Sequence, residues 1–455
     1  MSIATVWLAR VQTAIPPGSL RARFAAGTIW ALAGAVIAQS LQLAASVAVA
    51  RWLGKVGFGE LGILNSTVGM FGAFAGLGLG MTATKYVAEF RGRQPERAGK
   101  IFGLCMAVAT LSGLVGSGIL LLLAPTLAAR VLNAPHLVPE LRITCGLLFL
   151  NILIGVQNGT LAGVEGFADI AKVNLARGML NLPCMVAGTV FFGLRGAVWG
   201  MVVGAAGGCL VGHLVVKREC ARFGIPIAYR GCWEEQPILW SFSTPAFLAS
   251  IIPFPAMWGA NALLVNQANG YAEMGIFNAA NQWRVGVMFL PAIADQVLLP
   301  ILSNLYGEND SARFRKVLIA NILVVGGVCL AVCLPLALLS RFIMAAYGPG
   351  FAQGGWVLVA LLFAAFFASV PVIIGCAIAS IAKMWAGFIV NAIWLVAFMA
   401  ATYSWIHRGA MGLGMAYLVA YVIHAVIMTI YALKFMAPVI AQGGRLYPES
   451  AKPAM

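Results

Sequence analysis

A short run of polar and charged residues interrupts the apolar segment 275–303. Arg284 lies in its first half, with the amides of Asn281 and Gln282 just before it. Ionisable side chains inside a membrane are costly, so they generally face a wet cavity or a partner and mark a functional site. Asp295 follows 11 residues later, about 16 Å along one helix, which is too far for direct pairing with Arg284. We predict that Arg284, Asn281 and Gln282 bind substrate in a cavity and that Asp295 is a candidate for coupling to an ion.

Three further cations are candidates for the same cavity. Arg177 lies within the apolar segment 171–192, whereas Arg51 and Lys85 lie at the ends of such segments, where a long side chain can also reach the membrane surface. Acids are scarcer than cations inside these segments. This excess of positive charge favours an anionic substrate, such as a phosphate or diphosphate.

The composition of the chain is that of a membrane protein. Of its 455 residues, 61% are hydrophobic and 9% charged, whereas an average soluble domain is about half apolar and about a quarter charged. These proportions exclude a disordered chain, a nucleic-acid-binding domain and an ordinary cytosolic enzyme, despite the net charge of +15. A spanning helix needs about 20 mostly apolar residues. The sequence predicts twelve spans: 25–50, 60–84, 100–124, 141–163, 171–192, 196–216, 238–265, 275–303, 317–340, 355–379, 385–405 and 410–433.

The distribution of Lys and Arg predicts the orientation of these spans. The segments on one side of the membrane carry 21 of the 29 Lys and Arg residues, against 7 on the other side. Cytoplasmic loops are enriched in these residues, so we predict that both termini are cytoplasmic. The predicted parts are an interfacial N-terminal segment 1–23, a six-helix lobe 24–217, a cytoplasmic linker 218–237, a second six-helix lobe 238–434 and a cytoplasmic tail 435–455.

The two halves share a repeated motif. Residues 60–65 read Glu-Leu-Gly-Ile-Leu-Asn, and residues 273–278, which lie 213 positions later, read Glu-Met-Gly-Ile-Phe-Asn. Arg195-Gly196 and Arg408-Gly409 are separated by the same 213 positions. Because six spans per half is an even number, the sequence predicts parallel repeats, with a substrate path between two bundles that rock against each other.

Prolines interrupt the seventh predicted span. Pro245, Pro253 and Pro255 all lie within 238–265. Proline removes a helical hydrogen bond and collides with the preceding turn, so this span is not predicted to be a straight helix. We predict that these prolines form a hinge.

Motifs typical of enzymes are absent. The sequence contains no G-x-x-x-x-G-K-[ST], no H-E-x-x-H and no G-x-S-x-G, and its nine cysteines include no C-x-x-C pair. We therefore expect no enzymatic activity, no cofactor and no metal site.

Six segments, in their order along the chain, resemble bacterial polysaccharide flippases of the Wzx type. They are residues 49–66, 71–101, 242–266, 273–291, 300–316 and 347–355. That family is part of the multidrug/oligosaccharidyl-lipid/polysaccharide exporter superfamily. The resemblance implies an all-α polytopic membrane protein of MATE-like fold, with about 12 transmembrane helices in two parallel six-helix lobes.

The resemblance also implies a function. Members of that family move undecaprenyl-diphosphate-linked oligosaccharide from the inner to the outer leaflet of the bacterial inner membrane, through a cationic central cavity. Carried over, Arg284, Arg51, Lys85 and Arg177 become cavity or entrance cations. The expected partners are this lipid-linked oligosaccharide and membrane lipid, with glycosyltransferases and a polysaccharide polymerase working beside the chain, and no nucleic acid.

Three other functions are weighed against this one. A cation-coupled multidrug exporter on the same fold needs acids within the spans, of which Asp295 is the one present. A lipid II flippase often has additional spans. A membrane glycan polymerase needs a large outer loop with catalytic residues, and the predicted loops are short.

Overall fold

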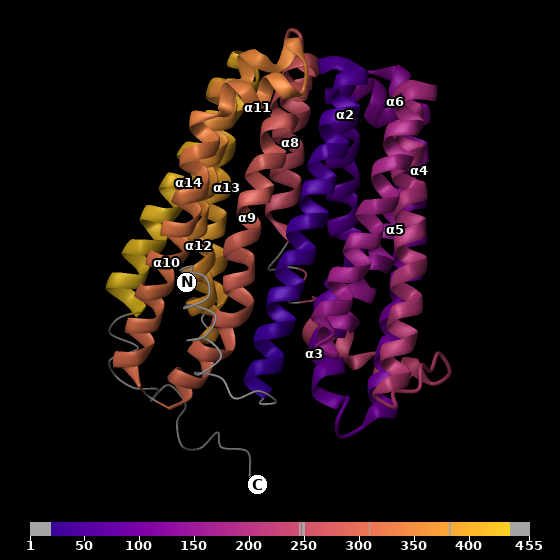
Figure 1. The fold of residues 1–455 in the computed structure, drawn as a ribbon, viewed down its shortest axis with the longest axis vertical. Coiled ribbons are helices and arrows are strands. Elements are labelled where there is room, and N and C mark those ends of the chain that lie inside the picture. Colours follow the sequence, from indigo (N-terminus) through magenta and orange to yellow (C-terminus); the bar gives the residue numbers. More distant parts are fainter. Residues whose placement is uncertain (1–19, 245–246, 248–250, 309, 382–383, 437–455) are drawn as a thin grey trace, which may run out of the picture. The chain divides into compact units, whose positions relative to one another are not determined.

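An apolar segment in a bilayer must satisfy its backbone hydrogen bonds internally, which favours helices. The computed structural model describes residues 20–244, 247, 251–308, 310–381 and 384–436, and these residues form helices and no strand (Figure 1). Most of the predicted segments 1–23 and 435–455 lies outside the described residues, as does Pro245 of the predicted hinge.

The α-helices follow the predicted spans closely. They are α2 (Leu20–Gly76), α3 (Leu79–Phe90), α4 (Pro95–Thr126), α5 (Val138–Gly163), α6 (Phe167–Arg222), α8 (Pro253–Val265), α9 (Gly270–Gly307), α10 (Ser311–Leu338), α11 (Ser340–Ala346), α12 (Gly355–Ser380), α13 (Met384–Trp405) and α14 (Gly409–Tyr431). Short 3₁₀ or π turns join them: Leu127–Val131, Pro135–Leu137, Cys232–Glu235, Leu239–Ser243, Pro349–Gly354, Ile406–Arg408 and Ala432–Met436.

Two helices are too long to be single spans. A straight helix of 56 or 57 residues would be about 85 Å long, against about 30 Å of bilayer hydrocarbon. Each is interrupted by a glycine with positive φ: Gly54 in α2 (φ 66°) and Gly193 in α6 (φ 60°). Gly409 (φ 63°) marks the same kind of break between α13 and α14. Only glycine adopts these angles without strain, so each residue forms the turn between two arms.

The membrane character of the helices is confirmed. Among the described residues, six helical runs are long and apolar enough to cross a membrane, and a seventh, 37–90, qualifies as a bent pair. The runs 167–222 and 385–434 are each long enough to cross twice. The predicted all-α polytopic fold is therefore correct. α8 has 13 residues and α9 contains a polar stretch, so neither is both long and apolar enough to qualify as a membrane span on its own.

The second span was predicted as a single segment, 60–84, but the structure divides it into two helices. The helix axis bends by 46° between α2 and α3, where Leu77 and Gly78 both have positive φ. α3 therefore begins a new helix, and it carries Lys85.

The described chain divides into two compact units. Unit 1 consists of 1–49, 68–126 and 136–250, and unit 2 of 50–67, 127–135 and 251–455. The chain thus passes between the units twice within α2, twice around residues 127–135, which join α4 to α5, and once within the predicted seventh span. The lobe boundaries drawn from the sequence, 24–217 and 238–434, stay a prediction.

Unit 1 contains parts of α2 together with α3, α4, α5 and α6, and these last four helices pack side by side (Figure 1). The second arm of α6 presents a glycine every fourth residue. A Cβ at Gly200 would lie 2.7 Å from the Cα of Met185 on the first arm, and one at Gly204 would lie 2.9 Å from the Cα of Asn181. The two arms therefore pack backbone against backbone, as small residues allow in membrane helices.

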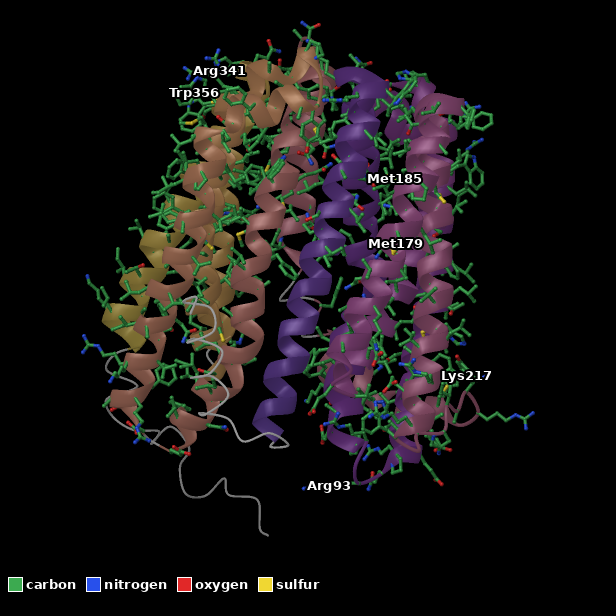
Figure 2. All side chains as sticks on the ribbon, viewed as in Figure 1. Arg93, Met179, Met185, Lys217, Arg341 and Trp356 are labelled. Atoms are coloured by element: carbon green, nitrogen blue, oxygen red, sulfur yellow. The ribbon has the colours of Figure 1, made fainter. Side chains whose placement is uncertain are left out.

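The linker 218–237 packs on α4 of unit 1. Arg97 donates to both carboxylate oxygens of Glu235, over 2.7 and 3.0 Å, and the Lys100 ammonium lies 2.6 Å from Glu234. The hydrogen bond to Glu235 raises the pKa of Arg97 above its ordinary value. Arg93 and Lys217 lie at this end of unit 1 (Figure 2).

In unit 2, α12 packs against α9, α10 and α14. It is the most apolar of these helices, and two thirds of the residues in its most apolar stretch are buried. One end of this unit, marked by Arg341 and Trp356 in Figure 2, is formed by α11 and the residues before α12.

The packing of α6 gives a stability prediction. Replacing Gly200 with Ala should destabilise the protein by about 1–3 kcal/mol, because the new Cβ meets backbone that cannot move aside. Thermal unfolding in detergent measures the effect. Gly118→Ala in α4 is the matched control, since its Cβ would meet nothing within 4 Å. Equal unfolding temperatures for the two variants would contradict the close contact of the arms.

Candidate functional site

Arg284 lies in the interior of unit 2. Its side chain is 7% exposed, and its Nε donates to Oδ1 of Asn281 over 2.7 Å, as the i,i+3 spacing on α9 permits. The guanidinium carbon lies 5.0 Å from the ring centroid of Tyr417 on α14, and Tyr421 also contacts Arg284. The face of an aromatic ring attracts a cation at this distance. The structure thus brings Arg284 and Asn281 together, as predicted, and adds two tyrosines.

An aromatic cluster surrounds this arginine on α13 and α14. Tyr417, Tyr421 and His424 share one face of α14, and Trp394 and Phe398 of α13 pack against them. Ring centroids are 4.7 Å apart for Phe398 and Tyr417, and 5.5 Å apart for Trp394 and Tyr421. We call these five residues the aromatic cluster. This cluster was not predicted from the sequence. The spacing of four and three residues between Tyr417, Tyr421 and His424, which places them on one helix face, could have indicated it.

The other two predicted site residues of α9 have different surroundings. Oε1 of Gln282 is buried and has no hydrogen-bond partner among the described residues. Asp295 contacts Cys376 of α12, whose Sγ lies 3.7 Å from the Asp295 carbonyl oxygen, and it takes part in none of the ion pairs found in the described chain. Asp295 and Arg284 are therefore separate features of α9.

Arg177 forms a polar cluster inside unit 1. Its Nη2 donates to Oδ1 of Asn151 on α5 over 3.0 Å. Close by, the buried Gln157 donates from Nε2 to Sγ of Cys209, 3.4 Å away. Gly208, on the second arm of α6, leaves room for the Arg177 side chain, since a Cβ there would lie 3.0 Å from its Cγ.

Lys85 is exposed on α3 of unit 1. Its ammonium lies 4.7 Å from the ring centroid of Tyr86 and 4.3 Å from that of Phe242. Beside it, the hydroxyls of Thr82 and Ser243 share a hydrogen bond of 2.7 Å. The first part of the predicted seventh span therefore packs on α3, and two aromatic rings hold the ammonium in place.

Arg51 lies at the tip of α2, in unit 2. Its Nε donates to the carbonyl of Ala346 over 2.7 Å. Nearby, a Cβ on Gly59 would collide with the Tyr271 carbonyl oxygen, and one on Gly275 with the Lys55 carbonyl oxygen. The segments that contain the two copies of the repeated motif thus pack backbone against backbone, and within the copies a Cβ on Gly62 would lie 2.9 Å from Cγ of Asn278.

The predicted hinge coincides with a passage between the units. α8 begins at Pro253, and the chain leaves unit 1 after residue 250. Proline is readily accommodated at the first position of a helix, where its missing N–H has no partner to lose. Ile252, just before Pro253, also has helical φ and ψ (−50° and −44°), so the hinge predicted at Pro253 and Pro255 stays a prediction.

The candidate cations are divided between the units. Arg177 and Lys85 belong to unit 1, whereas Arg284 and Arg51 belong to unit 2. No group of three or more His, Cys, Asp or Glu side chains that could hold a metal ion occurs in the described residues.

Comparison with known proteins identifies relatives of this chain. It is 23% identical over 424 residues to the EPS I polysaccharide export inner membrane protein EpsE of Ralstonia nicotianae, covering 90% of this chain and 94% of the relative. A multidrug resistance MATE family transporter of the MOP superfamily, solved in an inward-facing conformation, superposes with a TM-score of 0.73 at 17% identity, over 89% of this chain and 96% of that chain. A MOP superfamily transporter from Pyrococcus furiosus gives a TM-score of 0.65 at 14% identity, over 91% and 96%.

These comparisons confirm the predicted MATE-like fold. The relatives are named for export and transport, in agreement with the prediction that the chain is not an enzyme. The family model described as polysaccharide biosynthesis protein matches residues 24–306, more than half of the chain. The resemblance seen in the sequence is thereby confirmed, and the chain belongs to the polysaccharide biosynthesis protein family.

Proposed function

We propose that this chain is a flippase of the bacterial inner membrane. It moves undecaprenyl-diphosphate-linked oligosaccharide from the inner to the outer leaflet for export of a cell-surface polysaccharide. The observation that carries the proposal is a pair of arginines, Arg177 and Arg284, one inside each unit. Their side chains contact amides and an aromatic ring, and neither belongs to an ion pair of the described chain.

The chemistry of the substrate explains why such cations are needed. A diphosphate entering an apolar interior loses its hydration, and an unpaired charge there is very costly. Arginine compensates best, because its planar guanidinium bonds phosphate oxygens bidentately and keeps its charge. Arg177, Arg284, Arg51 and Lys85 are the candidate ligands, with Asn281 and Gln282 for the sugars, while the polyprenyl tail stays in lipid.

Alternating access supplies the movement. The tip of α2 packs within unit 2 through Arg51 and Gly59, and we propose that this contact opens when the head group leaves on the outer side. We propose that the proline-containing segment at Pro253 and Pro255 absorbs the rotation. In this proposal both termini are cytoplasmic, and glycosyltransferases and a polymerase work beside the chain.

The alternative is a multidrug exporter on the same fold, which the similarity to MATE transporters favours. It requires Asp295 to bind a proton or a cationic drug. The contact of Asp295 with Cys376, rather than with a polar cluster, supports the flippase instead.

The first test replaces Arg177. Arg177→Ala should lower flipping roughly tenfold or more, since a hydrogen bond to a charged group contributes about 1.5–3 kcal/mol, and Arg177→Lys should retain part of the activity. The assay uses proteoliposomes containing undecaprenyl-diphosphate oligosaccharide and scores access of the outer leaflet to a glycosidase. Lys217→Ala is the matched control, because it also removes one cation but at an exposed end of unit 1 (Figure 2), and it should leave flipping unchanged. Full activity of Arg177→Ala would remove this residue from the proposal, and efflux of a cationic dye without flipping would establish the alternative.

The second test locks the tip of α2. A Cβ at Gly350 would lie 3.5 Å from Cδ of Lys55, so Lys55→Cys and Gly350→Cys can be joined by a short thiol crosslinker after the native cysteines are replaced. Crosslinking should abolish flipping, because the tip can no longer separate from this part of unit 2. Lys100→Cys with Glu234→Cys is the control pair, since it joins the linker to α4 and should leave flipping unchanged. Transport by the crosslinked tip would show that this contact is not a gate.

The third test concerns the hinge. Pro253→Ala with Pro255→Ala should slow flipping several-fold without lowering the unfolding temperature, because a continuous helix resists bending. Pro335→Ala, which restores a helical hydrogen bond within α10, is the matched control. If the double variant transports at the rate of the native chain, the hinge lies elsewhere.

A further inference from the structure

The charge of Arg284 is incompletely compensated inside unit 2. Arginine keeps its proton under all ordinary conditions, so burial cannot neutralise it as it can a lysine or histidine. Its Nε is bonded to Asn281, and one ring face lies against it, but no carboxylate pairs with it in the described chain. A negative charge is therefore missing from its surroundings.

Two side chains of the aromatic cluster, Trp394 and His424, have ring nitrogens without a hydrogen-bond partner among the described residues. Trp394 is 3% exposed, and its Nε1 has no hydrogen-bond partner among the described residues. His424 is 6% exposed, and neither of its ring nitrogens has a partner there. An indole N–H can only donate, and a neutral imidazole donates through one nitrogen. A buried donor without an acceptor is costly, so both groups require a ligand that accepts.

These groups and Arg284 meet through Tyr421. The Tyr421 ring centroid is 5.5 Å from that of Trp394 and 6.5 Å from that of His424, while Tyr421 itself contacts Arg284. The centroids of Trp394 and His424 are 6.3 Å apart. One cation and two unsatisfied donor groups, from α9, α13 and α14, therefore gather around a single tyrosine.

We propose that unit 2 holds one small inorganic anion at this place, bound by Arg284, Trp394, His424 and the hydroxyl of Tyr421. A water molecule could accept from the indole, but it carries no charge to offset Arg284. A cation is excluded by the guanidinium, and the positive edges of aromatic rings also favour negative charge. The small exposure of all three groups favours a dehydrated monatomic anion such as chloride. The same chemistry suits a phosphate, whether free or in a lipid head group, and the experiment separates these sources.

The inference does not depend on flipping, so the test uses purified protein in detergent. The unfolding temperature is measured while chloride replaces gluconate at constant ionic strength. A ligand that binds only the folded state raises this temperature, and above its Kd the rise grows with the logarithm of the ligand concentration, here to a few degrees. We expect Arg284→Gln to abolish the rise, and Trp394→Phe, which keeps the ring and removes its donor, to weaken chloride binding about tenfold.

Matched controls come from the same unit. Trp385→Phe removes an exposed indole from α13, and Arg341→Gln removes an exposed cation outside the cluster; both should keep the chloride response of the native protein. Arg284→Lys, which keeps the charge and should retain a weaker response, guards against misfolding of the glutamine variant.

Parallel titrations with inorganic pyrophosphate and with undecaprenyl diphosphate identify the anion. A response to chloride that requires Arg284 and Trp394 supports the inorganic anion. A response to pyrophosphate or to the lipid alone overturns the small-anion proposal and assigns the cluster to the diphosphate. An unfolding temperature that is insensitive to every anion, or equally sensitive in Arg284→Gln and the native chain, also overturns it. Each result leaves the flipping assay to decide the proposed function separately.

Discussion

The cost of keeping a charge in an apolar interior shapes both units. The guanidinium group carries a charge, so neighbouring helices must bring polar or polarisable groups to Arg177 and Arg284. In unit 1, an amide of α5 and glycines of α6 meet this need, because the missing side chains leave space for the guanidinium stem. In unit 2, an amide of the same helix and the rings of α14 serve instead. The same requirement is thus met by small residues in one unit and by aromatic ones in the other.

Much of the fold was predictable from the sequence, because the apolar segments and their breakers are local signals. Most of the spans and the turns between them follow from runs of apolar residues and from single residues that interrupt a helix. The bend at Leu77–Gly78 was missed, because a non-glycine residue with positive φ leaves no mark in a glycine-rich segment. The match of Arg195-Gly196 with Arg408-Gly409 was also incomplete. The residue that adopts the angles of Gly409 is Gly193, so the structural correspondence is shifted by three positions there.

The candidate site was less predictable, because it depends on contacts between distant segments. The sequence analysis identified Arg284 and Asn281, which are neighbours on one helix, and placed them together correctly. It could not identify Tyr417 or Trp394, since only the packing of α13, α14 and α9 makes these residues neighbours of the arginine. Arg51 and Lys85 were also found from their position, but their partners, a backbone carbonyl and two rings, were not.

The contact between the two copies of the repeated motif has a consequence for the history of the chain. Gly62 of the first copy lies against the Asn278 side chain of the second, and Gly275 of the second lies against the Lys55 backbone just before the first, so a side chain added at either glycine meets the other segment. The duplicated halves can therefore drift apart in sequence over most of their length, but not independently at this point. A larger residue here is tolerated only with a compensating change in the opposite copy. Residues 60–65 and 273–278 are therefore expected to change together, because each segment is part of the other's environment.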